Sequence, residues 1–417
     1  MEDNLTENPE VGLAIFVAVR KRGETLERVR LRTPAELALV PSLLTGRWPW
    51  DSTSDDTDSE AASAADIDEQ RRAAVRLGLL VGRDEVPATA EDLRFRCDVD
   101  EETLRLMPRA RVAEVPQLPP RALELNPRLY VQEGTELPEE VAVRDVFASR
   151  TVTGPSQFSA ARPVVWVTDP TWDTLAPLWC GGTWGADLRR VAVDGAAPST
   201  LSAESARALQ LAGVLVPQAK AVQSSSVPGA ASFDKASSGQ EIMVLRDIFS
   251  PVFLAGLRRH FRRMRAEGYF SIDGLQVVNQ RSGMYCDVVT LFIQQQLTRV
   301  VSHWTGTAVR PSYTWFMNYL PGAELRRHRD RPQCRWNVSF CIDTEPDVQS
   351  HETWPFYIES KSDSDTSKIF KVNLNVGDAV IYSGTDQEHW RDVLAPGHQM
   401  GMGFLHYVDA DFEGGLK

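Results

Sequence analysis

The sequence predicts an α+β protein in which an α/β N-terminal region precedes a C-terminal sheet sandwich or jelly roll with flanking helices. Two observations lead to this fold class. From residue 313 onward, short apolar runs alternate with turn residues, which is typical of antiparallel sheets. Two helical patterns precede these runs, and a stretch rich in Ser, Ala and Gly separates them from the N-terminal region.

Length and composition are those of a folded globular chain. Of the 417 residues, 42% are hydrophobic and 24% are charged, which excludes wholesale disorder, collagen and coiled coil. Since a domain commonly holds about 150 residues, the length predicts two or three domains.

Net charge and cysteine content limit which binding partners and which cellular compartment we expect. The formal net charge of -12 argues against nonspecific nucleic-acid binding, which requires a positive field. No run of about 18 apolar residues occurs, and the first residues are acidic where a signal peptide would be basic. The five cysteines form no CxxC pair and are odd in number, which argues against a disulfide framework and a cysteine zinc site. We expect a cytoplasmic protein that binds neither nucleic acid nor membranes; its oligomeric state is not predicted.

Residues 1–219 are predicted to form a recognition or scaffolding region. The stretch 51–66 is acidic and has almost nothing to bury, so it predicts a solvated loop. Two segments, ending at Val81 and Val216, each place a helical pattern before a glycine and an apolar strand. This order fits two related winged-helix-like halves, and fits a common α/β arrangement at least as well. The region holds no histidine and no glycine-rich phosphate loop, so we expect no catalytic metal or nucleotide site in it.

Residues 220–240 are predicted to be a linker, and residues 241–417 a C-terminal domain. One helix is expected to start at Ser250-Pro251 and a second to end at Gly306. Six short strands are expected after them: SYTWFMNYL, RWNVSFCID, PFYIES, IFKVNL, DAVIYS and MGFLHYVD.

The residues that indicate chemistry are His328, Asp330 and His389. In an extended chain, positions i and i+2 point to the same side, so the imidazole of His328 and the carboxylate of Asp330 can reach one metal ion. An H-x-D pair alone is a weak signal, because a surface ion pair has the same pattern. His389 follows Asp330 by 59 residues (389 minus 330), in a polar loop after an apolar strand, and supplies a second imidazole.

Two histidines and one carboxylate on one face leave three octahedral positions open. Fe(II) needs such positions to bind a bidentate cosubstrate and O2, so the pattern predicts oxygenase chemistry. A zinc hydrolase could use the same ligands, but its usual HExxH helix is missing from the sequence.

The segments YTWFMNYLPGAELRRHRD and VGDAVIYSGTDQEHW, in this order, resemble the Fe(II)/2-oxoglutarate-dependent dioxygenases, especially their prolyl-hydroxylase-like branch. The resemblance covers about residues 241–417. It implies a double-stranded β-helix with His328, Asp330 and His389 as catalytic metal ligands. It also implies an enzyme that uses Fe(II), 2-oxoglutarate and O2 to hydroxylate a C–H bond. The branch implies as substrate an amino-acid side chain, free or within a peptide or a small-molecule natural-product intermediate.

One position departs from this family. An Arg or Lys about ten residues beyond the distal histidine binds the far carboxylate of 2-oxoglutarate in the family, whereas Gln399 stands here. Our first replacement is Arg335, which opens a strand whose alternate residues are polar. Arg391 is the second candidate and Arg331 a weaker third; for each, a solvated surface charge is the alternative. The hydroxyl groups of Tyr313 and Tyr319 could donate hydrogen bonds to the same cosubstrate.

Two other functions remain open from the sequence. The C-terminal domain could be a degenerate jelly roll that has lost its cosubstrate and serves binding or assembly, which the departure at Gln399 favours slightly. It could also be a cupin-like metal enzyme that does not use 2-oxoglutarate. The intact pattern of two histidines and one aspartate argues against the first of these.

Overall fold

The computed structural model describes most of the C-terminal half of the chain and parts of the N-terminal half. The described residues are 16–22, 25–31, 34–39, 64–77, 89–90, 97–132, 164–168, 172, 174–181, 184–218, 241–266, 270–272, 280–347, 353–361 and 367–416. They belong to two compact units, one of residues 1–94 and 147–157 and one of residues 95–146 and 158–417.

Several expectations fall outside the described residues. They are the linker at 220–240, most of the acidic loop at 51–66, and the strand that ends at Val81. The predicted domain boundaries and the two winged-helix-like halves therefore stay predictions.

Among its described residues, the first unit contains a small antiparallel sheet and two helices. Its strands are β1 (Phe16–Arg22), β2 (Thr25–Leu31) and β3 (Thr89–Ala90), and β1 pairs with both of the others. Helix α1 (Pro34–Leu37) precedes helix α3 (Ala64–Arg76), and Ala73 and Ala74 of α3 are buried.

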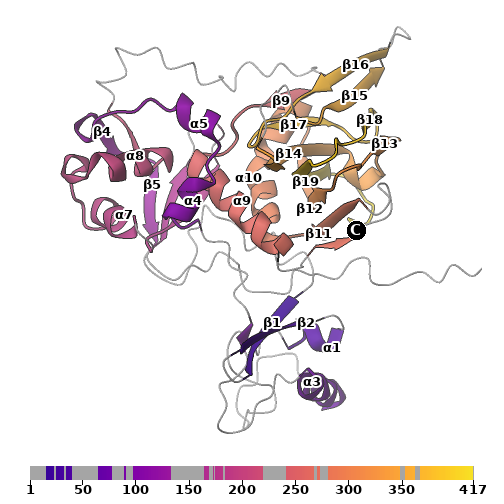
Figure 1. Ribbon diagram of the computed structural model, residues 1–417. Helices are drawn as coiled ribbons and strands as arrows, with labels where there is room; N and C mark the ends of the chain where they lie inside the picture. Colours follow the sequence, from indigo (N-terminus) through magenta and orange to yellow (C-terminus); the bar gives the residue numbers. More distant parts are fainter. Residues whose placement is uncertain are drawn as a thin grey trace, which may run out of the picture. The chain divides into compact units, whose positions relative to one another are not determined.

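Two antiparallel sheets form the C-terminal part of the second unit, in agreement with the predicted sandwich (Figure 1). The larger sheet has the order β10-β11-β12-β19-β14-β17-β9. Its strands are β9 (Met243–Leu245), β10 (Ser271–Ile272), β11 (Arg281–Tyr285), β12 (Val309–Tyr319), β14 (Trp336–Glu345), β17 (Ala379–Ser383) and β19 (Gln399–Asp409). The smaller sheet has the order β13-β18-β15-β16. Its strands are β13 (Leu325–His328), β15 (Phe356–Lys361), β16 (Ser367–Val372) and β18 (Glu388–Arg391).

The six strands expected from the sequence correspond to β12, β14, β15, β16, β17 and β19. Strands β13 and β18 are short and charged, so their sequences carry little periodic signal. Contacts between the rings of Phe356 and Tyr382, 5.3 Å apart, and of Tyr319 and Trp354, 5.1 Å apart, join the facing surfaces of the two sheets. The site described below lies between these surfaces.

Helices α9 (Pro251–Ala266) and α10 (Val288–Thr305) cover the other face of the larger sheet (Figure 1). Both helix ends agree with the sequence prediction, since α9 begins at Pro251 and Gly306 caps α10 at a φ of 69°. Alternate residues of β12 contact the helices: the ring of Phe316 lies 5.8 Å from that of Phe261, and Thr314 Oγ1 lies 2.6 Å from Thr290 Oγ1. The intervening residues therefore face the smaller sheet.

Residues 97–218 of the second unit mix helices with antiparallel strand pairs. The helices are α4 (Glu101–Arg105), α5 (Arg109–Glu114), α7 (Gly185–Ala192) and α8 (Ala203–Leu211). Strands β5 (Leu129–Gln132), β6 (Val164–Thr168) and β7 (Leu175–Trp179) form one sheet, and β4 (Leu123–Leu125) pairs with β8 (Leu215–Pro217).

The helix–glycine–strand order that ends at Val216 is present in this region. Helix α8 is followed by Gly213, whose φ is 76°, and then by β8. A left-handed φ of this kind favours glycine, which explains why a glycine separates the two elements.

Candidate metal centre

Strands β13 and β18 bring the two predicted histidines together. The strands pair antiparallel, and His328 lies directly opposite His389 in their register. Residues directly opposite in an antiparallel pair point to the same face of the sheet. The centres of the two imidazole rings are accordingly 4.3 Å apart.

Asp330 completes a group of three possible metal ligands. Its Oδ1 lies 3.5 Å from His328 Nε2, and its Oδ2 lies 3.6 Å from His389 Nε2. One ligand atom from each residue falls within 4.8 Å of the others. Two imidazole nitrogens and one carboxylate oxygen are a donor set that suits Fe(II) and leaves coordination positions open.

Backbone carbonyl groups orient both imidazoles. His328 Nδ1 lies 2.7 Å from the carbonyl oxygen of Arg326, and His389 Nδ1 lies 3.0 Å from that of Gln387. Since a carbonyl oxygen can only accept, each Nδ1 carries the proton and donates it. In the neutral form of each imidazole, Nε2 therefore keeps its lone pair for a metal ion.

A chain of buried polar groups holds the carboxylate of Asp330. Asn337 Nδ2 donates to Asp330 Oδ2 at 2.6 Å, and Asn337 Oδ1 accepts from His406 Nδ1 at 2.6 Å. Asn337 and His406 lie opposite each other on β14 and β19 of the larger sheet. Residues of the larger sheet thus hold the carboxylate of Asp330, although Asp330 itself follows β13 of the smaller sheet.

Gly384 makes room for this arrangement. A Cβ atom at Gly384 would lie 2.4 Å from Asn337 Nδ2, 2.7 Å from Asp330 Oδ2 and 2.3 Å from the carbonyl oxygen of Cys334. The carbonyl of Gly384 also accepts from the backbone N–H of Asp330 at 2.8 Å. Any side chain at this position would displace Asp330.

Burial and hydrogen bonding shift the pKa values of the titratable groups in the site in different directions. Burial opposes the ionisation of Asp330, but the hydrogen bond from His328 and the nearby His389 and His406 lower its pKa to about 2. Burial lowers the pKa of His389. Burial also acts to lower the pKa of His328, but the hydrogen bond and negative charge of Asp330, together with the hydrogen bond to the Arg326 carbonyl, outweigh burial and raise it. Burial lowers the pKa of His406 to about 4, so His406 is neutral in its bond to Asn337.

Arg391 is a buried cation close to the three possible ligands. It lies two residues beyond His389 on β18, so both side chains point to the same face. Its guanidinium donates to the carbonyl of Trp354 and lies over the rings of Trp354 and Phe356, 4.8 and 4.9 Å from their centres. Among the residues that the structure describes, no carboxylate lies within ion-pair distance of Arg391. Burial lowers its pKa to about 10.

Arg335 is placed differently. Its guanidinium forms an ion pair with Asp386 and donates to Thr385 Oγ1 at 2.7 Å, and the side chain is partly exposed. A carboxylate of the protein therefore already compensates its charge. Gln399, at the position where the family has its basic residue, accepts from Arg265 at 3.3 Å and from Asn318 at 3.2 Å on the helix side of the larger sheet.

The two tyrosines named from the sequence lie on the inner face of the larger sheet. Tyr313 is buried, and its hydroxyl contacts Cys334 Sγ at 2.8 Å and accepts from Arg331 Nε at 3.1 Å. Tyr319 is buried against Trp354. No described side chain bonds to the hydroxyl of Tyr319, so this group could donate to a bound molecule.

Some residues around the site were not singled out from the sequence. The ring of Tyr382 packs 5.0 Å from His389, and that of Phe356 packs 5.7 Å from it. The sequence contained Tyr382 only as the aromatic end of an apolar strand, and nothing in its local pattern distinguished Asn337 and Gly384. The pairing of β14 with β17 and β19 is needed to identify them.

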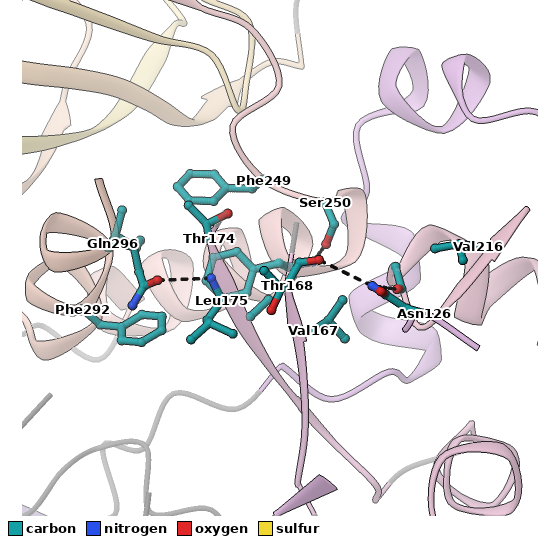
Figure 2. A pocket seen from close by; sticks show the side chains of 14 residues that line it. Asn126, Val167, Thr168, Thr174, Leu175, Val216, Phe249, Ser250, Phe292 and Gln296 are labelled. Carbon is teal, nitrogen blue, oxygen red and sulfur yellow. Dashed lines mark hydrogen bonds between the residues drawn. The ribbon is translucent and has the colours of Figure 1, made fainter. Parts of the chain in front are cut away.

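A separate small pocket, with a cavity volume of about 70 Å³, lies between β6, β7 and helices α9 and α10 (Figure 2). The described residues that line it are mostly apolar, and none is titratable. Its polar groups bond within the protein: Gln296 accepts from the Leu175 N–H at 3.3 Å, and Asn126 donates to the Gly213 carbonyl at 3.0 Å. The chemistry of the site therefore does not extend to this cavity.

Solved structures similar to this chain match its C-terminal part. A prolyl-4-hydroxylase from Pseudomonas putida is 14% identical, with 41% of this chain and 94% of that chain covered and a TM-score of 0.34. HygX from Streptomyces hygroscopicus, solved with nickel and 2-oxoglutarate bound, is 12% identical over 41% of this chain and 84% of that chain, with a TM-score of 0.32. AviO1 from Streptomyces viridochromogenes is 18% identical over 46% of this chain and 100% of that chain, with a TM-score of 0.34.

The C-terminal part of the chain thus has structural matches among Fe(II)/2-oxoglutarate oxygenases, prolyl hydroxylases included, as the sequence motifs predicted. No family model and no curated protein matches the sequence. Among the helices of the described residues, none is both long and apolar enough to cross a bilayer.

Proposed function

We propose that this protein is an Fe(II)- and 2-oxoglutarate-dependent oxygenase that hydroxylates an unactivated C–H bond. The observation that carries the proposal is the grouping of His328 Nε2, Asp330 and His389 Nε2 within 4.8 Å of one another. The two imidazoles come from adjacent strands and have their Nδ1 atoms bonded to carbonyls. A surface ion pair would require neither this register nor this tautomer.

The three residues fit Fe(II) and would hold it by two nitrogens and one oxygen. Bound there, Fe(II) with 2-oxoglutarate and O2 supplies the oxidation of a C–H bond while the cosubstrate becomes succinate and CO2. The protein itself orients the metal ligands and encloses the site. Asn337 keeps the carboxylate of Asp330 in place, and the rings of Tyr382 and Phe356 exclude water from His389.

We assign the far carboxylate of 2-oxoglutarate to Arg391, which reverses the order of preference suggested by the sequence. A buried guanidinium is costly without a compensating anion, and a bidentate carboxylate is its natural partner. Arg391 meets this description and lies on the same face as His389, whereas Arg335 is already paired with Asp386. The hydroxyl of Tyr319 is proposed as a further donor to the cosubstrate, with Tyr313 enclosing the other side of the site.

The proposed substrate is an amino-acid side chain, free or within a peptide or natural-product intermediate. This class follows from the likeness of the motifs around His328 and His389 to the prolyl-hydroxylase-like branch. We propose that residues 1–219 act in recognition or as a scaffold.

An anaerobic titration with Fe(II) and 2-oxoglutarate tests the proposed function. We expect a weak visible charge-transfer band that requires both additions, and its loss in Asp330→Ala while the circular dichroism spectrum stays unchanged. Metal binding without such a band at any 2-oxoglutarate concentration would favour a cupin-like metal enzyme. Absence of metal binding would favour a degenerate binding module.

A further inference from the structure

A phenol and a thiol lie in contact beside the candidate metal centre. The distance between Tyr313 Oη and Cys334 Sγ is 2.8 Å, and both side chains are buried. Tyr313 lies on β12 and Cys334 ends the short helix η6 (Pro332–Cys334), so the contact joins two separate elements. The proposed function makes no use of Cys334.

The pair is close to the ligand Asp330. A Cβ atom placed on Gly384 would lie 2.3 Å from the Cys334 carbonyl oxygen and 2.7 Å from Asp330 Oδ2, so both residues border the same methyl-sized space. The ring of Tyr313 lies 4.5 Å from the ring of His406, which bonds to Asn337 and through it to Asp330.

Arg331 fixes the direction of the phenol hydroxyl. Its Nε donates to Tyr313 Oη at 3.1 Å, and its guanidinium carbon lies 4.6 Å from the centre of the tyrosine ring. Since this donor occupies an acceptor position of the oxygen, the hydroxyl hydrogen is left to point toward Cys334 Sγ. The sulfur therefore lies at the hydroxyl end of the tyrosine ring.

Ordinary thiolate chemistry does not account for this placement. Burial raises the pKa of Cys334 to about 12, so its sulfur stays protonated and is a poor nucleophile or metal ligand. Phenols and thiols are, however, the protein groups most readily oxidised by an oxidant generated nearby. The contact is therefore suited to an oxidative reaction between its two members.

We propose that Tyr313 and Cys334 become joined by a thioether bond between Cys334 Sγ and the ring carbon next to the Tyr313 hydroxyl. This modification site rests on the proposed oxygenase function, which supplies the oxidant. One S–H and one ring C–H bond break and one C–S bond forms. The two hydrogen atoms leave with two electrons and reduce one oxygen atom of O2 to water, while the other oxygen atom enters succinate as 2-oxoglutarate loses CO2.

The cross-link would tie β12 to the segment that directly follows the metal ligand Asp330. It would also fix the phenol under Arg331. We expect it to form once per chain, in turnovers without substrate, and to stiffen the position of Asp330.

Mass spectrometry of the full chain tests the cross-link. The protein, freed of metal and kept reduced, is mixed anaerobically with Fe(II) and 2-oxoglutarate and then exposed to air, and succinate is measured in the same sample. We expect the intact mass to fall by the mass of two hydrogen atoms, with one fewer free thiol among the five cysteines. Digestion should yield the Tyr313 and Cys334 peptides joined and resistant to thiol reductants.

Three variants control the test. Cys334→Ala and Tyr313→Phe should each abolish the mass loss, and Cys341→Ala should keep it, because Cys341 is equally buried but lies within hydrogen-bond distance only of the Asp343 carbonyl among the described residues. Succinate formation without mass loss, or with oxygen added to Cys334, would overturn the cross-link and leave the oxygenase proposal standing. Absence of both succinate and mass loss would overturn both proposals.

Discussion

Small groups of atoms determine whether the candidate centre can bind a metal ion, and Gly384 is the clearest case. Because Gly384 has no side chain, the carboxylate of Asp330 and the amide of Asn337 fit into the space that a Cβ atom would fill. The glycine does not have a positive φ, so its role is close approach and not backbone conformation.

Gly384→Ala should therefore impair the metal centre. The added methyl group would force Asp330 away from its ligand position, with an expected loss of about tenfold to 100-fold in Fe(II) affinity and of about 1–3 kcal/mol in stability. Titration calorimetry and thermal unfolding measure these two effects.

Gly415→Ala is the matched control, because a Cβ there meets nothing within 4 Å. It should change neither quantity. Unaltered metal affinity in Gly384→Ala would show that Asp330 does not need the space that this glycine leaves.

Arg391 allows the cosubstrate assignment to be tested at a single residue. Arg391→Met keeps most of the volume and removes the charge, so the Kd for 2-oxoglutarate should rise by about 100-fold. Arg335→Met should change it by less than about threefold, because Arg335 is paired with Asp386. The charge-transfer band, followed against 2-oxoglutarate concentration, gives both values. A larger effect for Arg335 would restore the order suggested by the sequence.

Metal affinity should depend on pH through His328. Its pKa is raised, so it retains its proton to higher pH, whereas the pKa of His389 is lowered and that of Asp330 falls to about 2. A metal ion must displace the proton of His328, so affinity should increase with pH until the raised pKa is passed. At about pH 6, calorimetry in two buffers of different ionisation enthalpy should record the release of about one proton per metal ion. Release of none would mean that His328 is not a ligand.

At the scale of elements, the register of two short strands creates the site. Among the described residues, strand β13 pairs only with β18, and this pairing sets His328 opposite His389. A shift of one residue would turn one imidazole to the outer face. The neighbouring contact of the Arg327 guanidinium with the ring of Trp390, 4.6 Å from its centre, and the ion pairs of Arg327 with Glu388 and Glu359 stabilise the observed register on the outer face.

A buried ion-pair cluster joins α9 to the larger sheet. Asp343 of β14 accepts from Arg258 at 2.8 Å and from Arg262 at 2.6 Å, and Arg258 and Asp343 are almost fully buried. Asp343→Ala would leave the buried guanidinium of Arg258 with only the exposed carboxylate of Asp347, 3.8 Å away. We expect a loss of about 3–5 kcal/mol in the free energy of unfolding, measured by chemical denaturation.

An exposed ion pair serves for comparison. Glu241 and Lys368 are 4.0 Å apart and solvent-exposed, so Glu241→Ala should change stability by less than about 0.5 kcal/mol. Equal effects of Asp343→Ala and Glu241→Ala would show that the cluster does not hold α9 on the sheet.

At the scale of the whole molecule, the described residues between 97 and 218 and the C-terminal sheets belong to one compact unit. Cys97 Sγ donates to the Val252 carbonyl at 3.3 Å, Arg258 donates to the Leu106 carbonyl at 2.7 Å, and the rings of Trp166 and Phe292 are 6.2 Å apart. These contacts cover the faces of α9 and α10 that point away from the larger sheet.

Two fragments test how far the C-terminal part depends on these contacts. Residues 95–417 should melt within about 3 °C of the full chain. Residues 241–417 should melt at least about 10 °C lower, or aggregate, because apolar faces of both helices become exposed. A fragment 241–417 as stable as the longer one would support the domain boundary predicted at 220–240.

Local patterns in the sequence were sufficient for many elements. Strand alternation predicted polar residues along one side of the strand that Arg335 opens, and the structure agrees, since Asn337 bonds to Asp330 while Phe340 packs on Phe249. The i and i+2 spacing of His328 and Asp330 likewise needs only an extended backbone. Such features depend on residues that are close together in the sequence, so the sequence alone is enough to predict them.

By itself, then, the sequence determined the sandwich, the two helices and the three residues of the candidate centre. The tertiary structure alone decided that Arg391 is buried without a described carboxylate while Arg335 is paired, that Gly384 leaves space for Asp330, and that His406 supports it through Asn337. The physical reason is that burial and hydrogen bonding between strands depend on sheet order and register. Those are set by contacts between residues far apart in the chain, which no local pattern contains.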